Sequence, residues 1–294
     1  DSFVSRGLGD VYKRQEDRMS SKVLNGFFVN GSLDSLRLIG MASTTYHLFE
    51  DSLYKGKNLT SGDTIIMRFD EKDLDDIIVD GGSQGEYVPN KKTNDSDFPL
   101  IYSADRIDYF LKTETTKLIG NAKAKHENTD LKAGFIEVNW PSRILNAFPK
   151  QPHDSINQFI KPTIIEKGRD PMVGNEMTYN LDTKKGKINY GKTRADDGFY
   201  KGKEIRNESD KTIYIKNSIF TTCDLDTPHF HFESNKMKII QDDVVIAKPI
   251  ILKIAEIPLF GIPLAIFPHQ GGRRHSGWIM PAYGESKSRG QYID

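Results

Sequence analysis

Alternation of apolar and polar residues with a period of two is the feature that most constrains the fold of this chain. The alternation begins near residue 27 and returns in stretch after stretch, each followed by Gly, Asn or Asp. In one such stretch Ile136, Val138 and Trp140 share one side. Successive side chains of a β-strand point to opposite faces, so the pattern predicts strands with one buried face. No stretch has the spacing of an amphipathic helix, and we therefore expect an all-β protein.

In the last third of the chain the same pattern singles out one set of apolar side chains. These positions are Ile213, Ile215, Ile219, Phe230, Phe232, Met237 and Ile239. Lys216, Lys236 and Lys238 occupy intervening positions. Turning the apolar side outward would expose a large apolar patch beside these lysines, so we expect it to face the interior. The pattern leaves open whether that interior is a closed core or a groove.

Short sequences also recur along the chain. Residues 53–56 (LYKG), 131–134 (LKAG) and 199–202 (FYKG) resemble one another, at a spacing of roughly 70–80 residues. A turn glycine precedes each: Gly40, Gly120 and Gly191. We therefore predict three loosely similar strand–turn–strand units that share one core.

Three segments depart from the alternating pattern. Residues 89–99 and 149–172 are rich in Pro, Asn, Asp and Lys, which predicts surface loops. Residues 1–15 have neither the apolar stretch of a signal peptide nor strand alternation. We interpret them as a non-native junction segment that takes no part in the fold.

The charge balance excludes some classes of function. Lysine plus arginine equals aspartate plus glutamate, 41 each, so the net charge is zero and no basic surplus points to nucleic acid. The longest apolar stretch runs from Pro249 to Pro268, but it contains further prolines together with Lys253 and Glu256. A membrane-spanning helix is therefore not expected there.

Candidate catalytic and metal-binding motifs are few. His229 and His231 have the spacing of two metal ligands on one strand face, but Glu233 follows too early for a metal-binding jelly roll. The adjacent carboxylates Asp75 and Asp76 would point to opposite faces of a strand, which suits a turn better than acid–base catalysis. Residues 271–274 (GGRR) lack the strand–loop–helix context of a phosphate loop. We predict no catalytic residue, no metal and no cofactor.

Several motifs near the C-terminus occur in a specific order. They are FTTCD at residues 220–224, IPLFGIP at 257–263 and RRHSGWIMP at 273–281. This order resembles the lipopolysaccharide-assembly family LptD, also called OstA or organic solvent tolerance protein, in its Bacteroidetes-like version. The resemblance covers residues 22–294 and is strongest over 174–294.

The resemblance implies a fold and a function. Residues 16–267 would form an OstA-like β-jelly roll of two twisted sheets, open along one side, and residues 268–294 would hold the first strands of an outer-membrane β-barrel. The jelly roll would lie on the periplasmic side of the cell outer membrane, accept lipopolysaccharide and pass its acyl chains towards the barrel. The implied partners are lipopolysaccharide, an OstA-like periplasmic bridge protein that pairs along a strand edge, and an outer-membrane lipoprotein that plugs the barrel.

The resemblance also assigns roles to residues. Together with the alternation, it makes Ile213, Ile215, Phe230, Phe232, Met237 and Ile239 the candidates for contact with acyl chains. It pairs Cys223 with a barrel cysteine outside these residues, whereas composition alone leaves this single cysteine free or paired with a partner elsewhere. His275 interrupts the Arg-Ser pair usual in the family, which is a departure from its pattern.

Three alternatives remain open at this point. The chain could be a free-standing periplasmic bridge protein of the OstA-like type, which should lack the motifs after Phe267. It could be a metal-dependent jelly-roll enzyme, in which His229 and His231 hold the metal. It could be a purely structural β-domain, which would bind no ligand of the lipid A type.

Overall fold

The computed structural model describes residues 17–50, 53–70, 73–90, 98–150, 159–168, 170–195, 198–209, 211–225, 227–240, 243–268, 283–286 and 290–293. Every regular element in these residues is a β-strand, which confirms the all-β prediction. The part of the chain that the structure describes contains no helix able to cross a bilayer. The predicted junction segment 1–15 lies outside the described residues.

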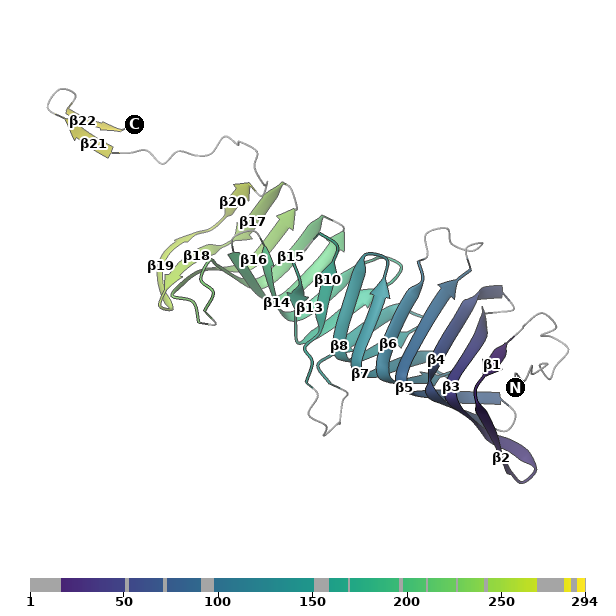
Figure 1. Cartoon of the computed structure of the whole chain (residues 1–294). Coiled ribbons are helices and arrows are strands. Elements are labelled where there is room, and N and C mark those ends of the chain that lie inside the picture. Colours follow the sequence, from purple (N-terminus) through teal and green to yellow (C-terminus); the bar gives the residue numbers. More distant parts are fainter. Residues whose placement is uncertain are drawn as a thin grey trace.

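Ten long strands form the frame of the molecule. They are β3 (Ser32–Glu50), β4 (Leu53–Asp70), β5 (Asp73–Pro89), β6 (Leu100–Phe110), β7 (Thr115–His126), β8 (Thr129–Asn139), β13 (Gly186–Ala195), β14 (Gly198–Ser209), β15 (Thr212–Thr221) and β16 (Phe230–Ile240). Each bends near its middle, so that its two halves belong to two different layers, which we call arm A and arm B (Figure 1).

Shorter strands belong to a single arm. Arm A adds β2 (Val23–Val29), β9 (Ile144–Phe148), β12 (Glu176–Asn180), β17 (Val244–Lys248) and β20 (Ala265–Pro268). Arm B adds β1 (Arg18–Ser20), β10 (Thr163–Glu166), β11 (Met172–Val173), β18 (Ile250–Ile254) and β19 (Ile257–Ile262). The strands β21 (Tyr283–Ser286) and β22 (Gly290–Ile293) form a separate two-stranded sheet.

Both arms continue from one end of the stack to the other, with antiparallel pairing throughout. Arm A runs from β2 to β20 and arm B from β1 to β19, and the strands lie side by side along the long axis (Figure 1). Among the described residues no pairing joins the free rims of the two arms. The molecule is therefore a twisted roll of two sheets, open along one side, as expected.

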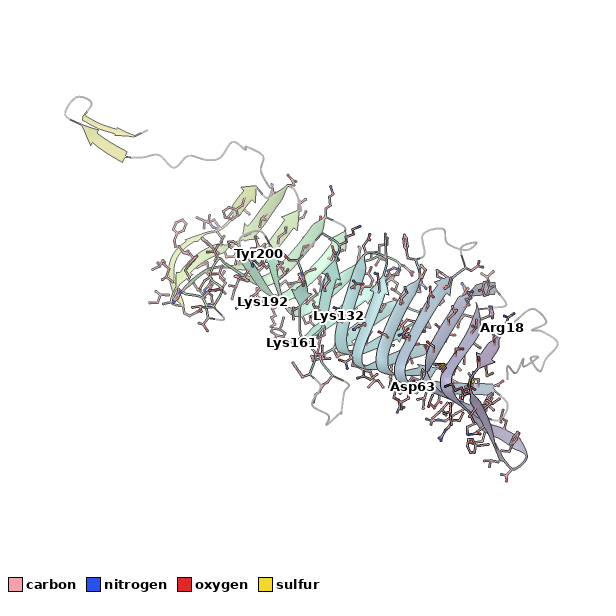
Figure 2. The ribbon with its side chains drawn as sticks, viewed as in Figure 1. Arg18, Asp63, Lys132, Lys161, Lys192 and Tyr200 are labelled. Carbon is pink, nitrogen blue, oxygen red and sulfur yellow. The ribbon has the colours of Figure 1, made fainter. Side chains whose placement is uncertain are left out.

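The bends depend on left-handed backbone positions. In β7 the bend residues Gly120 and Asn121 have φ of 73° and 45°, and the pairing with β6 is interrupted there. A Cβ atom on Gly120 would lie 2.4 Å from Oδ2 of Asp105 on the neighbouring strand. Glycine is needed at this position for its conformation and for the space. Asp63 of β4 is the counterpart of Asp105, because it lies beside Gly81 of β5, and it lies on the curved edge of the roll (Figure 2).

The core lies between the arms. Large aliphatic side chains of arm A point inward, and Leu38, Ile65, Val79, Ile107, Leu118, Ile136 and Leu145 are nearly inaccessible to solvent. Close to the bend, arm B presents the small residues Ala42, Ser83, Ala104, Ala122 and Ala133. Because these side chains are small, the two arms can approach each other near the bend. The aliphatic groups of arm A then fill the core between them.

Three details of the sequence interpretation need correction. The predicted third turn glycine, Gly191, is not the left-handed residue of its bend; that residue is Tyr190, with φ of 51°. Ile219 does not share a face with Ile215, because the bend at Asn217 reverses the alternation and turns Ile219 outward. The segment 149–172 is not only a loop, since it contains β10 and the start of β11. The three-unit repeat and the boundary at residue 267 stay predictions.

Candidate functional site

The interior between the arms widens into a pocket in the half of the roll nearer the N-terminus. A pocket of about 640 Å³ lies there, within the range typical of small-molecule sites. Its lining residues include Tyr46, Leu48, Asn58, Thr60, Tyr87, Tyr109, Phe110, Leu111, Thr116 and Trp140. They come from the facing inner sides of both arms, so the pocket is a widening of the groove.

The floor of this pocket is a chain of buried hydroxyl groups. Tyr102 donates a hydrogen bond to Oδ1 of Asn58 at 2.6 Å, and its oxygen lies 3.1 Å from the hydroxyl of Tyr109. The Tyr109 hydroxyl is also 2.8 Å from Oγ1 of Thr60. Because Tyr102 gives its proton to Asn58, Tyr109 donates to Tyr102 and Thr60 donates to Tyr109. The chain links Tyr109 of arm A to three residues of arm B.

Burial affects the ionisation of the two tyrosines of the floor in the same way. Tyr102 and Tyr109 are 2% and 7% exposed. Removal from water disfavours the phenolate and raises the pKa of both hydroxyls, that of Tyr102 well above its usual value. They therefore stay neutral and act as hydrogen-bond partners that hold the arms together.

Aromatic side chains form one wall of the pocket. The rings of Tyr87 on arm B and Trp140 next to β8 of arm A have centroids 4.8 Å apart. The indole Nε1 of Trp140 donates to Oγ1 of Thr116 at 2.9 Å, which fixes the ring. Aromatic rings offer large apolar surface in a defined orientation, so this wall suits an apolar ligand.

Charged residues form the rim where the pocket meets solvent. Arg143 lies in the turn before β9, where it pairs with Asp182 at 2.8 Å and lies 5.8 Å from the ring centroid of Tyr87. Lys55 and Glu114 also line this side of the pocket. An interior that combines aromatic rings with hydroxyl groups, below a charged rim, fits an amphipathic molecule whose apolar part packs on the rings and whose polar part lies towards solvent.

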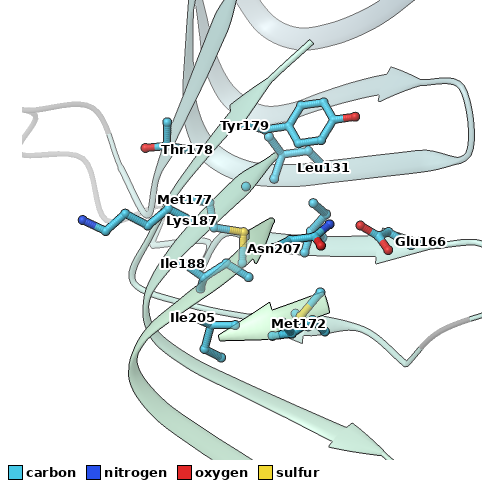
Figure 3. A pocket seen from close by; sticks show the side chains of 13 residues that line it. Leu131, Glu166, Met172, Met177, Thr178, Tyr179, Lys187, Ile188, Ile205 and Asn207 are labelled. Carbon is cyan, nitrogen blue, oxygen red and sulfur yellow. The ribbon is translucent and has the colours of Figure 1, made fainter. Parts of the chain in front are cut away.

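Halfway along the roll the interior is almost completely filled. Here each arm is built from short separate strands, β9 and β12 in arm A and β10 and β11 in arm B. The remaining space is about 20 Å³, lined by apolar side chains that include Leu131, Met172, Met177 and Ile205 (Figure 3). This volume is about that of one water-sized probe, so the groove is constricted here.

The predicted groove residues begin at this constriction, where Ile213 also lines the small space, and continue beyond it on the inner faces of the roll. Ile213, Ile215, Met237 and Ile239 belong to arm A, and Phe230 and Phe232 belong to arm B. Ile215 and Met237 are buried, whereas Ile213, Phe230, Phe232 and Ile239 are partly exposed. The structure thus brings all six to one interior, while their contact with a lipid stays a prediction.

This interior opens towards the end of arm B. A row of large side chains crosses β14, β15, β16, β18 and β19 in register: Tyr200, Phe220, Phe232, Leu252 and Phe260. Tyr200 is 9% exposed and Phe260 is 61% exposed. The apolar inner surface therefore becomes accessible as it approaches β19.

The two histidines considered as metal ligands have different surroundings. His229 precedes β16, and its Nδ1 lies 3.8 Å from Sγ of Cys223. His231 is 3% exposed, and its Nδ1 lies 3.9 Å from Oε1 of Glu256. Among the described residues no group of three or more His, Cys, Asp or Glu side chains could hold a metal ion. His269, His275 and the GGRR motif at 271–274 lie outside the described residues.

Sequence reasoning missed the wide pocket. The sequence places Trp140 on one strand face with Ile136 and Val138, but nothing in it shows that Trp140 would face Tyr87 across the groove or that Tyr109 would meet Thr60. The signal available was the clustering of Tyr and Trp on alternating positions, which predicts a buried aromatic face and not a cavity.

Comparison with known proteins now adds a decisive observation. Residues 245–294 match the family described as LptD protein. The chain is LptD-like in this region. The matched LptD region begins in β17 and includes β18, β19 and β20, where the apolar inner surface becomes exposed. The resemblance seen in the motifs of the sequence is confirmed over these residues.

Two further comparisons complete the picture. The chain is similar to the crystal structure of LptH from Pseudomonas aeruginosa, described as the LptA-homologous periplasmic component of the conserved lipopolysaccharide transport device. The identity is 16% and the TM-score 0.42, over 52% of this chain and 96% of LptH. A search among curated proteins gives no match.

Proposed function

We propose that this chain takes part in lipopolysaccharide transport and assembly at the outer membrane, as a periplasmic jelly roll that accepts lipopolysaccharide and passes its acyl chains along its interior. The observation that carries the proposal is the apolar inner surface that becomes accessible at β18 and β19, within the region similar to LptD. The function is transport and involves no covalent chemistry.

The energetics of the groove support this role. Burial of one methylene is worth about 0.8 kcal/mol, so a twelve-carbon acyl chain needs about 10 kcal/mol of shielding from water. The facing inner sides of the two arms supply apolar surface for this purpose, and the open side lets a chain enter without threading. The filled middle of the roll implies that side chains there, such as Met172 and Met177, move when a chain passes.

The wide pocket gives the amphipathic cargo a defined place. Acyl chains would lie against Tyr87 and Trp140, and the polar part of the molecule would stay near Arg143 and Lys55 at the rim. An arginine is suited to bind a phosphate group through two parallel hydrogen bonds. The pocket therefore supplies both kinds of contact that lipopolysaccharide requires.

The proposed partners follow from the two ends of the roll. Among the described strands, β1 and β2 form the edge at one end, and unpaired strand edges can accept a strand of an OstA-like bridge protein. At the other end we propose continuation into an outer-membrane barrel that holds a lipoprotein plug, with Cys223 disulfide-bonded to that barrel. Cys223 is free within this chain, which contains one cysteine.

Photo-crosslinking in cells tests the proposal. A photoreactive phenylalanine analogue at Leu111 in the wide pocket or at Phe230 in the far part of the groove should capture lipopolysaccharide. The same analogue at Lys123, on the outer face of arm B, serves as the control and should capture none. Equal capture from the inner and outer positions, or none from the inner positions of a folded protein, would show that the interior is an ordinary core.

A further inference from the structure

The outer face of arm A between β13 and β20 has an unusual excess of positive charge. One row of side chains crosses the strands in register: Lys187, Arg206, Tyr214, Lys238, Ile246 and Ile266. A second row beside it contains Glu204, Lys216, Lys236 and Lys248. We call these ten residues the basic face. It carries six cations and one carboxylate in a chain whose net charge is zero.

The carboxylate cannot balance this charge. Oxygen atoms of Glu204 lie 2.8 Å from Nζ of Lys216, 2.8 Å from Nε of Arg206 and 3.4 Å from Nζ of Lys187. Lys236 and Lys248 have no ion pair with any described residue. Lys216, Lys236 and Lys248 are direct cross-strand neighbours, and like charges in that position destabilise a sheet. Such a row becomes favourable when an external anion binds to it.

The same face of arm A is balanced in the other half of the roll. There Arg68 lies 3.4 Å from Asp76 across neighbouring strands, and Arg106 lies 2.7 Å from Asp108. The charge excess is therefore confined to the half that approaches the LptD-like region. A general need for solubility does not predict a charge excess confined to one half of this face.

Exposed apolar side chains lie among the cations of the basic face. Tyr214 is 41% exposed and Ile266 is 61% exposed, and both belong to the row that contains Lys238. The ammonium group of Lys238 lies 5.6 Å from the ring centroid of Tyr214. Cations combined with aromatic and aliphatic side chains are typical of surfaces that rest on a membrane, because the cations bind lipid phosphates and the apolar groups enter the headgroup region.

We propose that the basic face docks on an anionic membrane surface and binds the phosphates of phospholipid headgroups. Neighbouring strands hold successive side chains of a row about 4.8 Å apart, so several headgroups can be bound at once. Docking would hold the roll beside a membrane with its open groove free. The proposal goes beyond lipid passage through the interior and does not depend on it.

Sedimentation with lipid vesicles tests the proposal. The 294-residue chain should bind vesicles of phosphatidylcholine mixed with phosphatidylglycerol, and bind weakly to phosphatidylcholine alone. Each lysine near an anionic surface contributes about fivefold to partitioning, so Lys236→Gln with Lys248→Gln should lower binding about 25-fold. The control Lys123→Gln with Lys125→Gln removes the same charge from the outer face of arm B and should leave binding unchanged.

A second readout does not depend on any variant. Binding of the unmodified chain should weaken as salt rises from low to physiological concentration, because the attraction is screened. Thermal unfolding of each variant checks that the fold is kept. Equal vesicle binding by the Lys236–Lys248 variant and the unmodified chain overturns the proposal. An equal loss of vesicle binding in the Lys123–Lys125 control also overturns the proposal, because it would show that binding depends only on the net charge of the chain.

One outcome would assign the basic face to the cargo instead. If the Lys236–Lys248 variant keeps vesicle binding but loses capture of lipopolysaccharide at Phe230, the face binds phosphates of lipopolysaccharide and membrane docking is wrong. Loss of vesicle binding with unchanged capture at Phe230 supports docking and leaves the transport proposal intact. The experiments can therefore contradict the docking proposal without contradicting the transport proposal, and the reverse.

Discussion

Removal of one hydroxyl group from the pocket floor should weaken the contact between the arms. In Tyr109→Phe the ring keeps its packing, including the edge contact to Tyr102 with centroids 6.4 Å apart. Thr60 is 6% exposed, and its hydroxyl then loses its hydrogen-bond acceptor. A buried donor without a partner costs about 1–3 kcal/mol. Tyr102 still donates to Asn58, so we expect a total loss near 2 kcal/mol of unfolding free energy.

Urea unfolding measures this loss, provided that the slope of free energy against urea concentration is unchanged. Tyr87→Phe is the matched control, because the Tyr87 hydroxyl donates to the carbonyl of Lys55 in a long, part-buried bond of 3.3 Å, and its removal leaves no donor without an acceptor. Adding Thr60→Val to Tyr109→Phe removes the stranded donor and should recover part of the loss. A loss in Tyr109→Phe no larger than in the control would refute the reasoning, since it would show that water reaches the floor.

Three further predictions concern pH and packing. Burial raises the pKa of Tyr109, so above about pH 10 the unfolded chain loses its proton first and the free energy of unfolding should fall. The fall with pH should be shallower in Tyr109→Phe, as urea unfolding between pH 8 and 11 will show. The hydrogen bond from Lys216 lowers the pKa of Glu204 to about 2, so its contribution is present above about pH 4.5 and lost as pH falls towards 2. Glu204→Gln should therefore destabilise the protein at pH 7 and not at pH 2, as thermal unfolding at the two pH values will show. Gly134→Ala places a Cβ 1.9 Å from a backbone carbonyl oxygen and should cost about 1–3 kcal/mol or more, whereas Gly186→Ala, with its nearest atom at 3.5 Å, should cost less than 1 kcal/mol in the same assay.

The sequence was sufficient to predict which side chains face the interior within each half-strand. Ile213 and Ile215 are correctly placed, because alternation depends only on neighbouring residues and the pleat of one strand. The prediction failed for Ile219, two positions beyond the bend at Asn217. A bend that adds one residue reverses the phase of alternation, and asparagine marks a left-handed position too often in ordinary turns to reveal it.

Alternation in the sequence does not predict features that depend on contacts between distant strands. The wide pocket needs Thr60 and Tyr109 to meet across the groove, 49 residues apart in sequence. The basic face depends on the register that sets Lys216 opposite Lys236 and Lys236 opposite Lys248. Registers of this kind follow from turn lengths and from the bends, and alternation alone does not determine them.

The pairing order has a consequence for how the molecule forms and comes apart. From β3 to β8, each strand pairs with the strand that follows it in the chain. Each of these pairings joins strands that are neighbours in the chain, so folding can begin at any of several hairpins and spread in both directions. For the same reason opening need not be global. Strands at the ends, such as β1 and β19, can detach while the centre stays paired, and backbone amide protons should exchange with solvent earliest there and latest in β5 to β8.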